Sequence, residues 1–304
     1  MAWRVIGIQN PSRLSLRDNQ LVITQNEEVN LPIEDIDALI LDSYGITTTA
    51  NLLTELATNN TTVVICDEKH LPASVLLPYS QHSRQAKVSR LQLNMSQPLK
   101  KQLWQRIVMQ KISNQADVLQ HFNLNDMPLR QYAVQVKSGD STNRESIAAR
   151  AYFDQLLDDA TRRKPIWHNA ALNYGYAMVR SHIARHIATR GLVASQGIFH
   201  HSELNSFNLA DDLIESYRAV ADLFVLERLA PLHIGKQDTS LTRQDRQMLV
   251  DILNYYVIIQ NKKFTLKHAV EKTVESFIES TGAKEASKLL LPKISASWQG
   301  RDVI

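Results

Sequence analysis

The sequence predicts an α+β protein in which a small β-rich N-terminal domain precedes a larger all-α domain that carries the candidate site. Up to about residue 78, apolar residues occur in short alternating or continuous runs typical of β-strands. From about residue 82 the apolar period becomes that of α-helices, and only nine of 304 residues are glycine, which favours a helix-rich chain. We therefore expect a β-rich domain at 1–78, a linker at 79–84 and a helical domain at 85–304.

Several short strands are expected in the first domain. Residues 14–23 alternate around a polar turn, as in a β-hairpin, and residues 29–33 alternate again. Residues 38–41 and 63–66 are continuous apolar runs, typical of buried strands. A short helix between them has Leu52, Leu53 and Leu56 on one side.

The single cysteine and the lack of long apolar runs limit the class of protein. Cys66 lies in an apolar run, so we expect a buried strand residue, and one cysteine excludes an intramolecular disulfide and a zinc knuckle. No apolar run approaches the ~18 residues of a membrane span, and the N-terminus has no apolar stretch of a signal peptide. We expect a cytoplasmic protein. Pro72 and Pro78 bracket the expected exit from the β-rich domain.

The helical domain begins with a long helix. Apolar residues between Leu103 and Leu119 suit one helix after Pro98, and residues 169–190 suit another with Gly191 as its C-cap glycine. Further helices are expected at 209–224, 242–259 and 265–281, the last ending at Gly282.

The net charge of +3 conceals an asymmetry along the chain. Residues 1–75 carry a net charge of −6 and the remainder +9. Residues 82–111 contain seven basic residues and no acidic one. A solvated helix face usually mixes both signs, whereas a basic surface attracts phosphate backbones, so a polyanionic partner is favoured.

Five basic residues are candidates for phosphate contacts. Arg84, Lys87 and Arg90 recur at three-residue intervals and spread over one broad helix flank. Arg163 and Lys164 belong to a second basic run, which fits a solvated loop equally well.

Several familiar catalytic motifs are missing from the sequence. It contains no Walker loop, GxGxxG, HExxH or nucleophile elbow. His182 and His186 are spaced to share a metal ion, but Arg180 and Arg185 lie close by and no acidic residue shares their turn. A structural or phosphate-facing role is therefore favoured for the two histidines.

Glu145 has two interpretations that the residues leave equally open. Residues 142–145 have the form of a capping box, in which Glu145 starts a helix. Helical phase also places Glu145 within about 20° of Tyr152, on the apolar side of that helix. A buried carboxylate is costly without a partner, which a metal ion or a basic group would supply.

Asp212 and Glu215 form a second acidic group. They are three residues apart on one helix, so their carboxylates can converge, although an acidic solvated face is the favoured interpretation of this pair alone. Before them, the segment 197–201 brings His200 and His201 into a polar loop. Imidazole with carboxylate oxygens suits Mn²⁺ and is tolerable for Mg²⁺, and such an ion can polarise a phosphodiester.

Ordered sequence blocks over nearly the whole chain resemble one family. They are NRESIAAR at 143–150, NAALNYGY at 169–176, GIFH at 197–200 and NSFNLADDLIE at 205–215, with KI and NQ at 111–115. Together they resemble the integrase of CRISPR adaptation, the "Cas one" family, and their combination suggests the type II branch.

The resemblance implies roles for particular residues. Glu145, His200 and Glu215 stand at the positions of the catalytic metal ligands for Mg²⁺ or Mn²⁺, and Asp212 at that of an auxiliary acid. His200 rather than His201 stands at the family's histidine position, 15 residues before Glu215. Two departures put local helix geometry in doubt: Ser146 replaces a usual glycine, and residues 216–217 replace a common Pro-Phe.

The resemblance also implies an activity and partners. The family joins captured double-stranded DNA to a CRISPR repeat by 3′-hydroxyl attack, as a homodimer with the small "Cas two" protein and other adaptation proteins. Two alternatives stay open. One is a metal-dependent DNA-repair nuclease that uses the same site, and the other is a non-catalytic basic scaffold that holds DNA.

Overall fold

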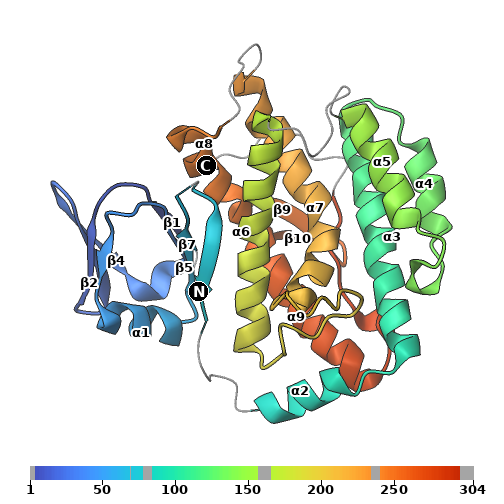
Figure 1. Cartoon of the computed structure of the whole chain (residues 1–304), viewed down its shortest axis with the longest axis horizontal. Coiled ribbons are helices and arrows are strands. Elements are labelled where there is room, and N and C mark those ends of the chain that lie inside the picture. The colour runs from blue at the N-terminus through green and yellow to red at the C-terminus, as the bar shows by residue number, and fades with distance from the viewer. Residues whose placement is uncertain (1–3, 69, 78–83, 157–165, 234–239, 295–304) are drawn as a thin grey trace.

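The computed structural model describes residues 4–68, 70–77, 84–156, 166–233 and 240–294. A β-rich part at the N-terminal end lies beside a larger helical part, which confirms the expected fold class (Figure 1). None of the helices in these ranges is long and apolar enough to cross a membrane.

Two four-stranded sheets build the β-rich part. The first has the order β1 (Arg4–Ile8), β5 (Ile36–Leu41), β7 (Thr62–Cys66) and β8 (Pro72–Leu76), with only β8 antiparallel to its neighbour. The second has the order β4 (Glu28–Pro32), β3 (Gln20–Thr24), β2 (Arg13–Arg17) and β6 (Thr47–Thr48). The 3₁₀ turn η1 (Ile33–Asp35) and the helix α1 (Ala50–Thr58) complete this part.

The structure confirms the expected hairpin but not the expected end of the β-rich domain at Pro72. The hairpin is confirmed as β2–β3, with Asp18 and Asn19 both at positive φ in its turn. The expectation that Pro72 already belongs to the exit is wrong, because Pro72 is the first residue of β8, an edge position that tolerates a missing N–H. Pro78 and most of the expected linker, 79–83, lie outside the described residues, so the division into domains stays a prediction.

The central strand β5 is apolar from Ala38 to Leu41 because both of its faces are buried there. Leu39 and Leu41 pack into a core between the sheets and α1. Ala38 and Ile40 point the other way and join the core of the helical part, together with Val64 and Cys66 on β7. The first sheet is therefore shared by two cores, and Cys66 is buried on a strand as expected.

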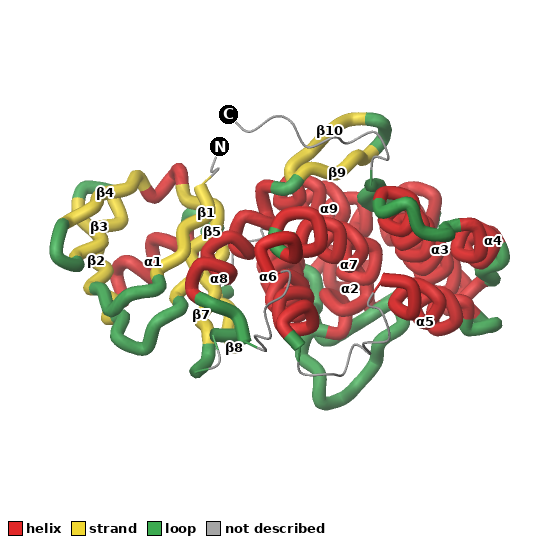
Figure 2. Tube along the Cα trace, turned by 90° about the horizontal axis from the view of Figure 1, so that it is seen from above, coloured by secondary structure: helices red, strands yellow, loops and turns green. Residues whose placement is uncertain are grey.

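Eight helices of the described residues form the rest of the frame. They are α2 (Gln85–Leu93), α3 (Gln97–His121), α4 (Met127–Val134), α5 (Arg144–Leu156), α6 (Trp167–Thr189), α7 (Asn208–Arg228), α8 (Arg243–Val250) and α9 (Leu266–Ala283). The 3₁₀ turns are η2 (Ser138–Asp140), η3 (Ala230–His233), η4 (Asp251–Asn254) and η5 (Ala286–Lys288). In Figure 2, α6 and α8 lie next to the sheet, and α4 and α5 lie at the far end.

One expected helix is partly wrong. Residues 242–259 contain α8 and η4, but then the strand β9 (Tyr256–Ile259), which pairs with β10 (Lys262–Thr265). Aromatic and β-branched residues favour a strand here, and Gln260 and Asn261, both at positive φ, form the tight turn. The helical domain thus carries a small hairpin in addition to its helices. The last helix ends at Ala283 rather than Gly282, and Lys284 takes the left-handed cap position.

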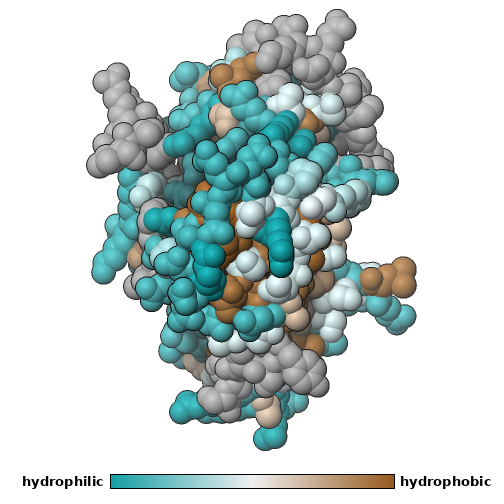
Figure 3. Space-filling view, turned by 90° about the vertical axis from the view of Figure 1, so that its left-hand side faces the viewer, coloured by the Kyte–Doolittle hydropathy of each residue, from teal (hydrophilic) through white to brown (hydrophobic). Residues whose placement is uncertain are grey.

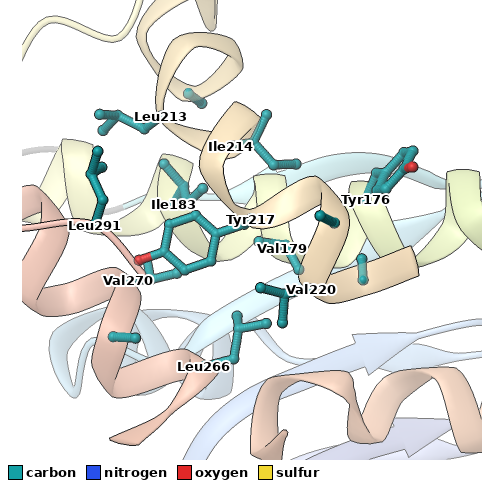
Figure 4. Close-up of a cluster of buried hydrophobic side chains, with 14 of the residues drawn as sticks. Tyr176, Val179, Ile183, Leu213, Ile214, Tyr217, Val220, Leu266, Val270 and Leu291 are labelled. Carbon is teal, nitrogen blue, oxygen red and sulfur yellow. The ribbon is translucent and has the colours of Figure 1, made fainter. Parts of the chain in front are cut away.

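The helical core is built where α6, α7 and α9 meet. Figure 4 shows Tyr176, Val179 and Ile183 of α6 facing side chains of α7 and α9. Gly175 of α6 faces α7 and η4, where a Cβ would make ordinary contacts with Ile252 Cδ1 at 3.4 Å and Ala221 Cβ at 3.9 Å. This packing fixes the position of the first turns of α7, which carry the candidate acids. The outer end of the β-rich part, in contrast, is largely hydrophilic (Figure 3).

His182 and His186 belong to the polar contact between the two parts. His182 Nδ1 lies 3.2 Å from Thr62 Oγ1 of β7, and the two Nε2 atoms are 3.2 Å apart. Arg185 Nη2 and Arg190 Nη1 lie 2.7 and 2.6 Å from the nitrogens of His186. Both imidazoles are buried, which supports the structural role expected for them rather than a metal site.

Acid is expected to destabilise the protein through this histidine pair. Burial and the Arg185 charge lower the pKa of both imidazoles well below the usual value. Below the unfolded-state pKa of about 6.5, the unfolded chain binds protons that the folded protein does not, so stability falls as pH falls. Between pH 6.5 and 5.5 we expect the pair to cost roughly 2 kcal/mol of unfolding free energy.

Chemical denaturation at both pH values measures this loss. The double variant His182→Gln/His186→Gln should lose less stability over the interval than the wild type, whereas His201→Gln, at an exposed position, should lose as much. Equal losses in the wild type and the double variant would contradict the assignment.

Candidate active site

A single buried lysine joins the two glutamates that the sequence singled out. Lys111 of α3 is 7% exposed, and its Nζ lies 2.5 Å from Glu145 Oε1 of α5 and 2.5 Å from Glu215 Oε2 of α7. Although 70 residues separate them in the sequence, the two carboxylates therefore meet at one point. Helices α3, α5 and α7 therefore surround one cluster of charged side chains.

Glu145 lies in the first turn of α5, but not as part of a capping box. Asp140 takes the capping role, since its carboxylate accepts hydrogen bonds from the backbone N–H groups of Arg144 and Glu145 at 2.8 and 3.0 Å. The capping-box interpretation is therefore wrong, and the Glu145 side chain is free of that role. Its side chain is 25% exposed and turns to Lys111, as the alternative interpretation required.

Glu215 is buried, so the interpretation of an acidic solvated face is wrong. Its side chain is 7% exposed, and Arg218 Nε donates to Oε1 at 2.7 Å while Lys111 holds Oε2. Burial opposes ionisation, but the charges of Lys111 and Arg218 outweigh it and lower the pKa of Glu215 to about 2. The same pairing raises the pKa of Lys111 despite its burial. At neutral pH Glu215 and Lys111 are thus both charged.

Asp212 organises the loop that carries His200. Its fully buried carboxylate accepts hydrogen bonds from the backbone N–H groups of Ile198, Phe199 and His200 at 2.5, 3.1 and 3.0 Å. Its Oδ1 also lies 2.7 Å from His200 Nδ1. This contact raises the pKa of the imidazole. It also directs the other ring nitrogen, Nε2, away from Asp212.

Gly197 is required by the close approach of this loop to α7. A Cβ at Gly197 would lie 2.2 Å from the His200 carbonyl oxygen and 2.6 Å from Asp212 Oδ2, far below contact distance. The glycine at the start of the GIFH block is therefore a packing requirement of the Asp212 cap.

A polar hollow of about 760 Å³ opens beside this loop. His200 lies in its wall with a side chain that is 42% exposed. Lys100 and Lys101 of α3 also line it, as does Trp104, whose ring stacks on Phe199 with the centroids 4.4 Å apart. Cations and stacked aromatic rings are the groups that hold nucleic-acid backbones and bases.

The other basic candidates lie elsewhere. Arg84, Lys87 and Arg90 are exposed on or next to α2, and Lys87 and Arg90 line a separate hollow of about 400 Å³ with Lys284 of the α9 cap. Arg163 and Lys164 fall outside the described residues. A DNA contact of all five stays a prediction, and Lys100 and Lys101 share the hollow of His200, which no described member of that set lines.

The sequence pattern indicates the acids of the site but not its cations. It singled out Glu145, Glu215, Asp212 and His200, which lie in two adjoining groups, but gave no role to Lys111 or Arg218. A signal was present: Lys111 lies between apolar positions of the long α3 helix, on the side of Val108 and Ile112. His201 is exposed, with Nδ1 at 2.9 Å from the Phe199 carbonyl oxygen.

In the described ranges, no group of three or more His, Cys, Asp or Glu side chains is close enough to hold a metal ion as arranged. Glu145 and Glu215 converge, while His200 is held separately on Asp212. The roles of these residues as metal ligands therefore stay a prediction.

Comparison with solved structures defines the class of fold. A casposase bound to its integration product matches with a TM-score of 0.76 at 18% identity, over 97% of this chain and 94% of that one. A Cas6-RT-Cas1–Cas2 complex matches with a TM-score of 0.71 at 18% identity, over 97% of this chain and 36% of that one. The β-rich part, the helical part and their order are thus those of the Cas1-type fold.

The sequence itself then gives the family. The family model described as CRISPR associated protein Cas1 matches residues 6–252. The CRISPR-associated endonuclease Cas1 of Neisseria meningitidis serogroup C (strain 8013) is 44% identical over 299 residues, which is 97% of both chains. The chain belongs to the Cas1 family.

Proposed function

We propose that this protein is the DNA endonuclease and integrase of a CRISPR adaptation system, joining short DNA fragments to the array by 3′-hydroxyl attack on the repeat. The observation that carries the proposal is the pair of carboxylates, Glu145 and Glu215, which converge on one cation, while the loop of His200 lines a hollow with Lys100 and Lys101. A divalent cation bound to such a pair would polarise a phosphodiester and stabilise the negative charge that develops on its oxygens.

The donor set fits a divalent metal. Glu145 and Glu215 supply hard oxygen donors at a point that already accommodates a cation, and the Nε2 atom of His200 is available because Asp212 uses Nδ1. We propose that these three residues hold Mg²⁺ or Mn²⁺. When bound, the ion would polarise the scissile phosphodiester and lower the pKa of the attacking hydroxyl.

The other side chains then have defined tasks. Asp212 fixes the loop and the ring orientation of His200, and Arg218 fixes one oxygen of Glu215, so that the other faces the site. Lys100 and Lys101 would neutralise phosphates of DNA in the hollow, while the exposed ring of Phe199, supported by the buried Trp104, offers an aromatic surface. These contacts position DNA without reading its sequence.

The comparisons support the proposal and its partners. The Neisseria relative is named an endonuclease, and the casposase was solved with an integration product. The Cas6-RT-Cas1–Cas2 complex supports a Cas2 partner. Two attacks on opposite strands need two sites at fixed spacing, for which a homodimer is the simplest assembly. The combination of sequence blocks supports the type II branch.

A plasmid assay tests the function. Purified protein, with and without its Cas2 partner, is given a supercoiled plasmid that carries the CRISPR array, a short labelled duplex and Mg²⁺ or Mn²⁺. We expect label covalently joined to the repeat, and no joining in EDTA. Nicks without joined label would support the nuclease alternative, in which water replaces the hydroxyl. DNA binding with neither product would support the scaffold alternative.

A further inference from the structure

The Lys111 ammonium occupies the very point at which the two carboxylates converge. Each partner oxygen, Glu145 Oε1 and Glu215 Oε2, is 2.5 Å from Nζ, and the second oxygen of Glu215 is held by Arg218. Lys111 lies on α3 and its two partners lie on α5 and α7, so the ammonium also ties these three helices together.

The charges of this cluster balance only while Lys111 is in place. Two glutamates carry two negative charges, and Lys111 with Arg218 carries two positive ones. A buried group of charges is tolerated when it is paired in this way. A divalent cation in place of the ammonium leaves one positive charge in excess, which a phosphate group would neutralise. The exchange therefore converts a closed, neutral cluster into one that attracts DNA.

The ammonium and a metal ion cannot occupy the site together. Carboxylate oxygens bind Mg²⁺ at about 2.1 Å, and Nζ already lies 2.5 Å from both oxygens that face the site. Like charges in a buried site also repel strongly. One cation must leave before the other binds.

We propose that Lys111 is a positioning residue that keeps the metal-free site folded and closed, and that a divalent metal binds only by displacing its ammonium. This inference rests on the proposed metal site at Glu145 and Glu215. Lys111 lowers metal affinity, because only the fraction of molecules with the ammonium displaced can bind the ion.

Titration of the full-length protein with Mn²⁺, followed by the paramagnetic resonance of the free ion, tests the exchange. If the displaced state is a tenth of the population or less, Lys111→Met should bind Mn²⁺ about tenfold tighter or more. In EDTA the same variant should melt at a lower temperature than the wild type, and Mn²⁺ should raise its Tm by more. Lys288→Met, an exposed lysine on η5, is the matched control and should change neither quantity. Unchanged or weaker Mn²⁺ binding by Lys111→Met would overturn the proposal.

A second measurement uses the wild type and needs no folded variant. Amine-selective acetylation followed by mass spectrometry should label Lys111 slowly in EDTA and several-fold faster with Mn²⁺, while Lys288 is labelled equally in both. Equal labelling of Lys111 in the two conditions would also overturn displacement.

Failure of the metal site itself has a different signature. If Glu145→Gln leaves the Mn²⁺ affinity of the protein unchanged, the proposed metal site is wrong, and the role of Lys111 falls with it. If Glu145→Gln weakens Mn²⁺ binding and Lys111→Met does not strengthen it, only the displacement is wrong.

Discussion

Replacing Glu145 by glutamine is expected to lower strand transfer about 1000-fold, since a metal ion contributes several kcal/mol to stabilising the transition state. Glutamine keeps the size of the side chain and one acceptor oxygen but removes the negative charge that a divalent cation requires. The helix start should survive, because Asp140 rather than Glu145 caps α5.

DNA binding separates this loss from a general defect. Removing a negative charge does not weaken the attraction of a basic surface for phosphates, so duplex binding measured by fluorescence anisotropy should be kept or slightly tightened. Glu279→Gln, an exposed acid on α9, is the matched control and should retain both binding and strand transfer. Full strand transfer by Glu145→Gln would contradict a catalytic role and support the non-catalytic scaffold.

Asp212→Ala is expected to have the second large effect, on stability as well as activity. The substitution leaves three backbone N–H groups of residues 198–200 without their acceptor and unties the His200 ring. Each buried donor without a partner costs about 1–3 kcal/mol, so we expect a loss of roughly 3 kcal/mol or more of unfolding free energy. Loss of the partner of a metal-ligating histidine typically costs 10- to 100-fold in metal affinity or activity, and we expect about 100-fold in strand transfer.

Denaturant titration and the plasmid assay measure these two effects. Asp154→Ala is the control, because this acid is 72% exposed and its ion pair with Arg150 spans 3.9 Å, so its free energy of unfolding should stay within about 0.5 kcal/mol. An active Asp212→Ala protein with wild-type stability would show that the loop does not depend on this carboxylate.

The period of apolar residues predicted most of the fold because burial imposes it directly. The hairpin β2–β3 and the helix α3 bury a repeating face, and the sequence shows that repeat, whereas α6 and α7 are buried on most sides and were expected from their long runs of apolar residues. The strand β9 was missed because a short apolar run fits a helix or a strand equally well, and pairing with β10 decided between them.

The site could be predicted only in part, for a different reason. The helical phase of residues 145–156 shows that Glu145 faces the buried side of α5. No local pattern shows that Glu215 of α7 meets Glu145 at Lys111 of α3. The burial of Asp212 and Glu215 depends on the loop 197–200 and on Arg218, neither of which affects the apolar stripe of α7. Lys111 was counted with a basic run because charge along the sequence does not distinguish a surface lysine from one enclosed by two glutamates.

The two-sided burial of β5 limits how this protein can be recombined with its relatives. A chimaera that takes the β-rich part from one family member and the helical part from another would carry Ala38, Ile40, Val64 and Cys66 to a surface of α6 that was selected for other side chains. A working chimaera would therefore have to take the sheet residues that face α6 from the same parent as the helices. The residues on the opposite face of the sheet could be taken from the other parent together with α1. The residues that must be exchanged together are thus defined by the face of the first sheet on which they lie, and not by their position before or after the linker.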